Sequence, residues 1–177
     1  MPSTTLISVE EYLSTSYDPD CDYIDGEVIE RNMGEADHGN LQNSIGAWLW
    51  TRRKALRIHV FTETRTQVAR TRFRIPDIAV TTHKTKGRIL REPPFLCIEI
   101  LSPEDRVSRM EVKIDDYLKF GVAHVWLIDP RKKLAWSYTR GGRREATAVL
   151  TTSEPRIELP IAELFAELDL DVDVSAE

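Results

Sequence analysis

Two acidic residues lie inside segments that otherwise have the composition of buried β-strands. Asp77 lies in Ile75–Val80, and Glu99 lies in the apolar run Phe95–Leu101. Short runs of aliphatic and β-branched residues between turn-forming residues are typical of buried strands. A carboxylate in such a place must be paired, hydrogen-bonded or bound to a metal, because an isolated buried charge is strongly destabilising. We therefore expect the stretch Arg74–Lys113, which holds both acids, to organise the rest of the chain.

The helices are predicted from apolar spacing and from capping sequences. Ser8 begins a capping-box sequence, which predicts a short helix near the N-terminus. Apolar residues at helical spacing predict a long amphipathic helix over His38–Arg57 and a second helix that ends at Gly121. A further short helix is expected at Pro160–Leu168.

Strand patterns occupy much of the remaining sequence. Asp25-Gly26 predicts the turn of a hairpin within Asp22–Arg31, and a second hairpin is expected to pair Leu134–Thr139 with Ala146–Leu150. Further strands are expected at His59–Glu63, Thr66–Ala69, Ile75–Val80, Phe95–Leu101 and His124–Ile128. This order predicts an α/β fold, with a mixed central sheet flanked by helices and hairpin additions at both ends of the chain.

Length and composition favour one soluble domain over residues 1–177. Hydrophobic residues make up 41% of the chain and charged residues 30%, which is ordinary for a globular protein. No apolar run approaches the roughly 20 residues that a membrane span needs, and the N-terminus lacks the features of a signal peptide. Cys21 and Cys97 have no metal-ligand spacing. We expect a cytoplasmic protein with reduced thiols, no membrane partner and a frayed tail at Asp169–Glu177.

The net charge of −5 conceals a segregation of charge along the chain. Thr51–Arg91 holds 12 Lys or Arg and two acids, a balance of +10, whereas the rest holds 12 bases and 27 acids, a balance of −15. Such a basic segment is typical of a surface that binds polyphosphate. The alternative is a solvated basic face balanced by the acidic flanks. If the segment binds nucleic acid, six residues are expected to contact its backbone: Arg52, Arg53, Arg57, Lys84, Lys86 and Arg88.

Two acids on neighbouring strands, followed by a lysine on a helix, indicate metal-assisted hydrolysis. Mg²⁺ or Mn²⁺ sites that cleave phosphodiesters need hard oxygen ligands and open positions for water and phosphate. Asp77 and Glu99 could supply two carboxylates, and the carbonyl of Ile100 a third oxygen. Lys113, on the helix after the Glu99 strand, could position the attacking water and stabilise charge on the phosphate. Alternatively, Asp77 caps a loop and Lys113 faces solvent.

The same residues resemble the Uma-type, restriction-endonuclease-like family of small bacterial proteins, within the PD-(D/E)XK nuclease superfamily. The resemblance runs from about Val9 to Pro130 and is weaker in the hairpin beyond. The matching pieces are Tyr23-Ile24-Asp25-Gly26-Glu27, His38 at a helix start, Ile75–Val80, Ile98–Pro103, Lys113 with Tyr117, Gly121-Val122 and Val125–Pro130. The resemblance implies a restriction-endonuclease-like fold and a nuclease site built on Asp77, Glu99 and Lys113.

Two positions depart from the pattern that this resemblance implies. The superfamily lysine stands two residues after the acid, where this chain has Leu101, and the Uma-type family moves it to the next helix, where Lys113 fits. The family also commonly has an aspartate four residues before this lysine, where this chain has Arg109. The second departure concerns the tuning of the site.

Three further residues are candidates for accessory roles. Glu27 resembles the acid of the family's Asp-Gly-Glu sequence and could add a metal or water ligand, assisting Asp77, Glu99 and Lys113 as a fourth catalytic residue, or it could only pair with an arginine. His38 could lie near the site or only cap its helix. Arg106 could contact phosphate or neutralise the acids of its helix.

The interpretation that joins these observations is a Mg²⁺- or Mn²⁺-dependent endonuclease acting on nucleic acid, with DNA favoured. The alternative is a nucleic-acid-binding or assembly protein on the same fold that does not cut. Arg109 and the net acidity favour this alternative, whereas the intact set of two acids and a lysine argues against it. Trp48 and Trp50 flank opposite faces of their helix, and an exposed tryptophan there could mark a homodimer contact.

Overall fold

The structure is a computed structural model, and it describes residues 6–32, 35–105, 107–166, 168 and 169. Helix α1 (Val9–Ser14) begins as predicted, because the Ser8 hydroxyl accepts a hydrogen bond from the N–H of Glu11 at 3.1 Å. Beside it lies a small sheet with the strand order β2-β1-β5-β4. Its strands are β1 (Asp22–Ile24), β2 (Glu27–Ile29), β4 (Thr66–Ala69) and β5 (Arg72–Arg74). Tyr12 of α1 packs on Tyr23 and Phe73 of this sheet.

The first predicted hairpin is confirmed. β1 and β2 pair with Ile24 opposite Glu27, so that Asp25 and Gly26 form a two-residue turn. Both turn residues have positive φ angles, 50° for Asp25 and 105° for Gly26. Aspartate tolerates this region and glycine adopts it freely, which is why Asp-Gly is a strong hairpin signal.

The central sheet has six strands in the order β10-β9-β8-β7-β6-β3. They are β3 (His59–Thr62), β6 (Ile78–Thr81), β7 (Leu96–Ile100), β8 (His124–Asp129), β9 (Leu134–Thr139) and β10 (Gly142–Glu145). β7 and β8 are parallel and the other neighbours antiparallel. The crossover between β7 and β8 is helix α3 (Val107–Phe120), as parallel pairing requires. This mixed sheet confirms the predicted fold class.

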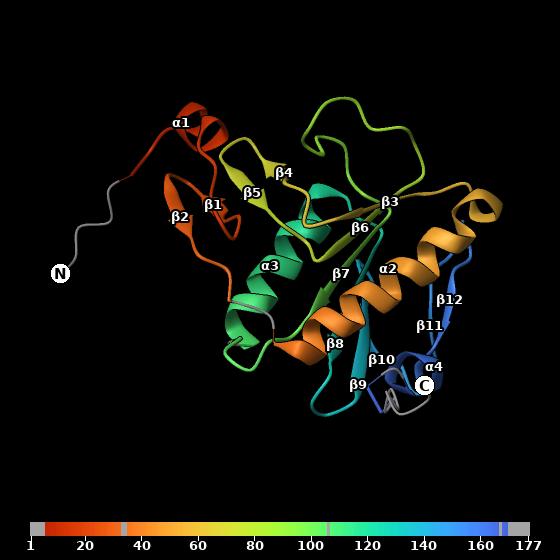
Figure 1. Cartoon of the computed structure of the whole chain (residues 1–177). Helices are drawn as coiled ribbons and strands as arrows, with labels where there is room; N and C mark the ends of the chain where they lie inside the picture. Colours follow the sequence, from red (N-terminus) through yellow and green to blue (C-terminus); the bar gives the residue numbers. More distant parts are fainter. Residues whose placement is uncertain (1–5, 33–34, 106, 167, 170–177) are drawn as a thin grey trace, which may run out of the picture.

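Helix α2 (Ala36–Leu56) and helix α3 cover the central sheet from different faces (Figure 1). The α2 stripe Leu41, Ile45 and Leu49 packs into a core that includes Ile98 of β7. The α3 stripe packs instead into a second core that includes Cys97. Because side chains alternate along a strand, Glu99 shares the face of Cys97 and points toward α3.

The predicted pairing of Leu134–Thr139 with Ala146–Leu150 is wrong. β9 pairs with β10 across the tight turn Arg140-Gly141, which makes an exposed polar segment the edge strand. The apolar residues beyond form β11 (Val149–Thr151), which pairs with β12 (Glu158–Pro160) ahead of helix α4 (Ile161–Ala166). Turn geometry selected the partner strand here, whereas apolar content had favoured the later segment.

Two other strand boundaries differ from expectation. β5 was not predicted, because Arg72 and Arg74 give it little apolar character. The strand expected at Ile75–Val80 begins only at Ile78, so Asp77 lies in the turn before it. The tail expected to fray lies outside the described residues apart from Asp169. No helix in the described part of the chain is long and apolar enough to cross a membrane.

Candidate active site

Asp77 and Glu99 meet at one end of the β6–β7 pair. The antiparallel register pairs Ile78 with Ile98, so continuing it by one residue sets Asp77 opposite Glu99. The main-chain N–H of Ile100 donates a hydrogen bond to Asp77 Oδ2 at 2.7 Å. Asp77 is 3% exposed and Glu99 is 2% exposed. The structure therefore brings together the two acids that the sequence singled out.

Asp77 is also held by an arginine from the segment between β2 and α2 and by a histidine of α2. Arg31 Nη2 lies 2.9 Å from Asp77 Oδ1, and His38 Nε2 lies 3.3 Å from Oδ2. Burial acts to raise the pKa of Asp77, but the hydrogen bond from His38 and the charges of Lys113 and Arg31 outweigh it and lower the pKa. Burial likewise acts to lower the pKa of His38, and Asp77 reverses this effect. Asp77 is therefore ionised.

Two side chains of α3 donate hydrogen bonds to the carboxylate of Glu99. Lys113 Nζ lies 2.8 Å from Glu99 Oε2, and the Tyr117 hydroxyl donates to Oε1 at 2.6 Å. The two residues are four apart and so lie on one face of the helix. Lys113 Nζ also donates to the carbonyl oxygen of Ile75 at 2.9 Å. The lysine thus joins α3 to both acid-bearing segments, and the reading of Lys113 as a solvent-facing residue is wrong.

The pKa values of Asp77 and Glu99 are shifted in opposite directions. Burial raises the pKa of Glu99 to about 7, and the nearby charge of Asp77 adds to the rise, against the lowering effects of Lys113 and Tyr117. Burial acts to lower the pKa of Lys113, but the negative charges of Glu99, Asp22 and Asp77 raise it. Lys113 is therefore charged, and Glu99 is only partly ionised near neutral pH.

A ladder of buried charges, formed by Asp22, Arg74 and Asp116, supports the site from behind. Arg74 lies between the two acids, with Nη1 3.0 Å from Asp22 Oδ2 and Nη2 2.6 Å from Asp116 Oδ2. Asp22 Oδ1 accepts the main-chain N–H of Ile75 at 2.9 Å. Ile75 is therefore held at its N–H by Asp22 and at its carbonyl by Lys113, which fixes the turn that carries Asp77.

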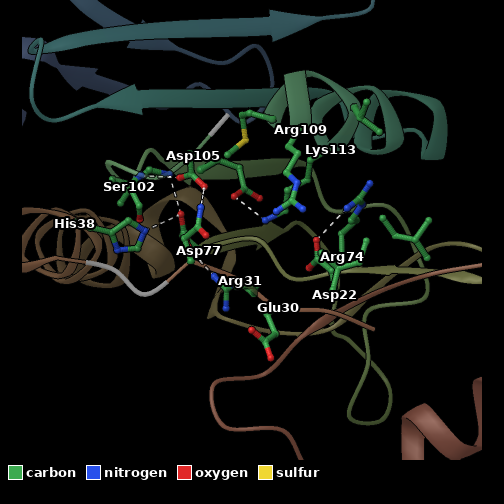
Figure 2. A pocket seen from close by; sticks show the side chains of 17 residues that line it. Asp22, Glu30, Arg31, His38, Arg74, Asp77, Ser102, Asp105, Arg109 and Lys113 are labelled. Atoms are coloured by element: carbon green, nitrogen blue, oxygen red, sulfur yellow. Dashed lines mark hydrogen bonds and ion pairs between the residues drawn. The ribbon is translucent and has the colours of Figure 1, made fainter. Parts of the chain in front are cut away.

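These groups open onto a pocket of about 210 Å³ between β1, the segment after β2, the start of α2 and the start of α3 (Figure 2). The two loops at its mouth are tied together, because Asn32 donates to Asp105 Oδ1 at 2.7 Å and Asp105 Oδ2 accepts the N–H of Ser102 at 2.6 Å. Glu30 and Arg109, both exposed, also line the pocket. The pocket therefore joins a buried acidic end to a charged rim.

The donor chemistry fits a hard divalent cation at the acidic end. A carboxylate offers about four lone-pair sites. Protein donors occupy two sites on Glu99 (Lys113 and Tyr117) and three on Asp77, so both retain acceptor capacity. Within the described residues, no group of three or more His, Cys, Asp or Glu is placed to hold a metal. The side chains therefore supply two carboxylates, and any further ligand must be a main-chain oxygen or water.

The three predicted accessory residues differ in where the structure places them. Glu27 is exposed and does not line the pocket, whereas Glu30, three residues later, does. His38 lies in the site through Asp77 and is not the N-cap of α2, which is Glu35. Arg106 falls outside the described residues.

The six residues expected to bind nucleic-acid backbone are not at the pocket. Arg52, Arg53 and Arg57 lie at the C-terminal end of α2. Arg57 follows His38 by 19 positions, which is about 28 Å along a helix at ~1.5 Å per residue. Lys84, Lys86 and Arg88 lie in the loop between β6 and β7, drawn in yellow-green at the top of Figure 1. These six residues and the acidic pair thus occupy separate regions.

Sequence reasoning missed several residues of the pocket. Arg31 and the charge-ladder residues Asp22, Arg74 and Asp116 each contact a partner more than 40 residues away. Local spacing carries no signal for such pairs. A weak signal exists for Asp22, which is an acid at the start of a strand whose other residues are apolar.

Comparisons with known proteins give nuclease descriptions. The family model Uma2, described as "Putative restriction endonuclease", matches residues 9–173. The chain is also similar to the crystal structure of a "putative nuclease belonging to DUF820" from Anabaena variabilis ATCC 29413. The two are 25% identical, with a TM-score of 0.81, and the match covers 92% of this chain and 99% of that one. No curated protein is similar enough to count as a match. These findings support a nuclease-like function.

Proposed function

The chain belongs to the Uma2 family, and on that premise we propose that it is a Mg²⁺- or Mn²⁺-dependent endonuclease that hydrolyses phosphodiester bonds in DNA. The observation that carries the proposal is the buried contact of 2.8 Å between Lys113 and Glu99, beside Asp77 and at the end of a pocket. A lysine and two acids buried together are costly to the fold. Their place at an opening indicates that function retains them.

In this proposal Asp77, Glu99 and the carbonyl of Ile100 hold the cation. When bound, the cation polarises the phosphate and lowers the pKa of a bound water. Lys113 keeps a positive charge beside the position where water and phosphate meet, and its contacts with Glu99 and Ile75 hold it there before substrate arrives. Tyr117 fixes the other oxygen of Glu99 and so leaves that carboxylate one orientation.

Arg109 has a separate role in binding. It lines the pocket one helical turn before Lys113 and is exposed. An arginine here provides donors for phosphate oxygens, whereas the aspartate common in related chains would repel them. The departure at this position therefore suits backbone binding without removing either metal carboxylate.

The experiment is incubation of supercoiled and single-stranded DNA with and without Mg²⁺ or Mn²⁺. Wild type is expected to cut only with the cation, and Glu99→Gln is expected not to cut. Glu10→Gln, which changes an exposed acid on α1, is the matched control and is expected to cut normally. Glu27→Gln in the same assay tests the accessory role of that residue. Equal cleavage by Glu99→Gln and wild type would overturn the assignment.

The second candidate function is nucleic-acid binding without cleavage. The observation that favours it is that Arg31 and His38 already neutralise Asp77. Calorimetric titration with Mn²⁺ separates the two functions, because a protein that only binds has no need for a divalent-ion site. Saturable binding that disappears in Asp77→Asn supports the endonuclease.

The proposal also covers the domain organisation, the location and the oligomeric state. We assign residues 1–177 to a single domain in the cytoplasm, in keeping with the buried free thiols of Cys21 and Cys97. We also assign a homodimer contact to Trp50, which is 53% exposed. Size-exclusion chromatography of Trp50→Ser tests the dimer, which this substitution is expected to dissociate.

A further inference from the structure

A second cavity, of about 180 Å³, lies on the other flank of α3 from the acidic pocket. Its walls include Met110 of α3, Leu127 of β8, and Trp136 and Tyr138 of β9. Met110 lines both hollows, so the two share one side chain as part of their walls. We propose that this cavity receives a nucleobase of the strand being cut, next to the scissile phosphate. The inference rests on the proposed nuclease function and names the form of its substrate.

The aromatic lining suits a flat heterocycle. A cavity of about 150 Å³ already admits benzene, so this one has room for the greater part of a base. Nucleobases stack on tryptophan and tyrosine irrespective of sequence, because every base has a π-face. The wall that adjoins the acidic pocket is Met110, whose flexible thioether adapts to different shapes. A base seated here would leave its own phosphate near Met110 and therefore near Lys113, one turn along α3.

Two residues that line the cavity also carry polar groups. The indole N–H of Trp136 is buried and has no hydrogen-bond partner among the described residues, and Trp136 is 9% exposed. A buried donor without an acceptor is unfavourable, so a shift of the Trp136 ring that brought this N–H to a ring nitrogen or carbonyl oxygen of a base would favour binding. Exposed Glu111 at the rim can accept from an exocyclic amino group.

Arg143 forms the lid of the cavity. It extends from the edge strand β10, opposite Tyr138. Its guanidinium lies 4.9 Å from the ring centroid of Trp136 and 6.0 Å from that of Tyr138. The planar guanidinium of Arg143 thus lies over the two aromatic rings, where a base would also stack. Within the described residues it makes no ion pair, so it is free to close over a bound base or turn to the adjoining phosphate.

A base stacked within a duplex cannot reach this cavity. The substrate must therefore present an unpaired base beside the cut, or a base turned out of the helix. The protein is consequently expected to bind single-stranded DNA more tightly than a duplex of the same sequence.

The test measures binding of a short thymidine strand that contains one 2-aminopurine, by anisotropy and by fluorescence quenching, without divalent cation. Tyr138→Leu and Arg143→Gln are expected to weaken single-strand binding roughly five- to hundredfold, the range for loss of one base stack, and to reduce the quenching. Arg144→Gln removes the same charge from the neighbouring position of β10, which does not line this cavity. It is the matched control and is expected to behave like wild type.

Trp136→Phe keeps a ring but removes the unpartnered N–H, and it is expected to weaken binding without loss of fold, checked by circular dichroism. If wild type binds the strand and the cavity variants bind as Arg144→Gln does, the base site is overturned and the nuclease proposal stands. If duplex binding equals single-strand binding in wild type, the base site is likewise overturned. If wild type binds no oligonucleotide at all, the base site is overturned, and the cleavage assay with cation decides the proposed function separately.

Discussion

At the residue scale, Asp77 is held by three donors that come from three separate parts of the chain. Arg31 lies after β2, His38 lies on α2, and the N–H of Ile100 ends β7. A buried carboxylate with such partners is stable without any bound ion. Removing one partner of a buried pair is costly, because the other charge remains buried and unpaired.

The first prediction concerns Asp77→Asn. Because the substitution leaves Arg31 and His38 without their carboxylate, we expect it to lower the free energy of unfolding by on the order of 3 kcal/mol. Mg²⁺ or Mn²⁺ is expected to raise the melting temperature of wild type, since a ligand that binds only the folded state stabilises it. Asp77→Asn should abolish this rise, and Glu10→Gln should retain it. Thermal melts with and without cation measure both effects, and equal shifts in both variants would exclude Asp77 as a ligand.

The second prediction concerns Lys113→Ala. Loss of a preorganised positive charge at the reacting centre typically costs about 10²–10³ in rate, and cation affinity should stay the same or rise because a neighbouring cation is removed. Tyr117→Phe removes only a hydroxyl donor and should cost less. Leu101 lines the second cavity rather than the acidic pocket, so Leu101→Lys is not expected to restore the rate. Single-turnover cleavage and calorimetry measure these quantities, and a normal rate in Lys113→Ala would end its assignment.

At the element scale, the site depends on how α3 is fixed against the two sheets. The charge ladder ties α3, through Asp116, to β5 and β1 of the small sheet. Lys113 and Tyr117 tie the same helix to β7 of the central sheet. The acidic pocket lies between these two sets of contacts, so its shape follows from the packing of one helix on two sheets.

The third prediction concerns His124, which joins β8 to the β11–β12 hairpin. The N–H of Ser153 donates to His124 Nε2 at 3.3 Å, and Nδ1 has no partner among the described residues. Burial lowers the pKa of His124, so the folded state binds fewer protons here than the unfolded state. The stability from neutral His124 is therefore present above its ordinary pKa of about 6.5 and is lost as pH falls through the lower folded value.

Urea unfolding at neutral and acidic pH tests this direction of the pH dependence of stability. Wild type should lose more stability on acidification than His124→Gln, which cannot be protonated. The comparison with the variant is needed because His38 has the opposite effect on the pH dependence of stability. Asp77 raises the pKa of His38, so the stability from this histidine persists at low pH. An equal loss in wild type and His124→Gln would contradict the assignment.

At the scale of the whole molecule, some bases of Thr51–Arg91 form ion pairs that stabilise the fold, whereas others lie away from the pocket. Arg65, Arg72 and Arg74 pair with Asp20, Asp25, Asp22 and Asp116 of the flanking sequence. Part of the charge segregation therefore stabilises the fold, as the alternative interpretation of the segment required. Arg52 and Arg53 instead lie over Trp48 and Trp50. The remaining bases lie away from the pocket, so only a long substrate could contact both regions.

The fourth prediction separates these regions by salt dependence. Nucleic-acid affinity should fall steeply with salt, and each lost phosphate contact should flatten the log–log slope by about 0.7–0.9. Arg109→Ala should flatten it, because this arginine lies at the pocket. Lys84→Ala and Lys86→Ala should also flatten it if the substrate extends over the loop between β6 and β7. An unchanged slope in the two lysine variants would remove that loop from the binding surface.

The sequence by itself determined the parts of this protein whose physics is local. The Ser8 cap, the Asp25-Gly26 turn and the apolar stripe of α2 depend on residues a few positions apart, and each appears as predicted. Asp77 and Glu99 were identifiable because a charge inside an apolar segment is conspicuous without knowledge of its partners. Lys113 became a candidate through its position on the helix after Glu99, strengthened by the family resemblance.

Only the tertiary structure decided which distant groups meet. The pairing of β9 with β10, the contact of Arg31 with Asp77 and the ladder through Arg74 join segments by geometry that no local pattern encodes. The place of the basic residues was also open, because charge along a sequence does not fix its distribution in space. Side-chain periodicity and turn chemistry act over a few residues, whereas these contacts depend on the packing of whole elements against one another.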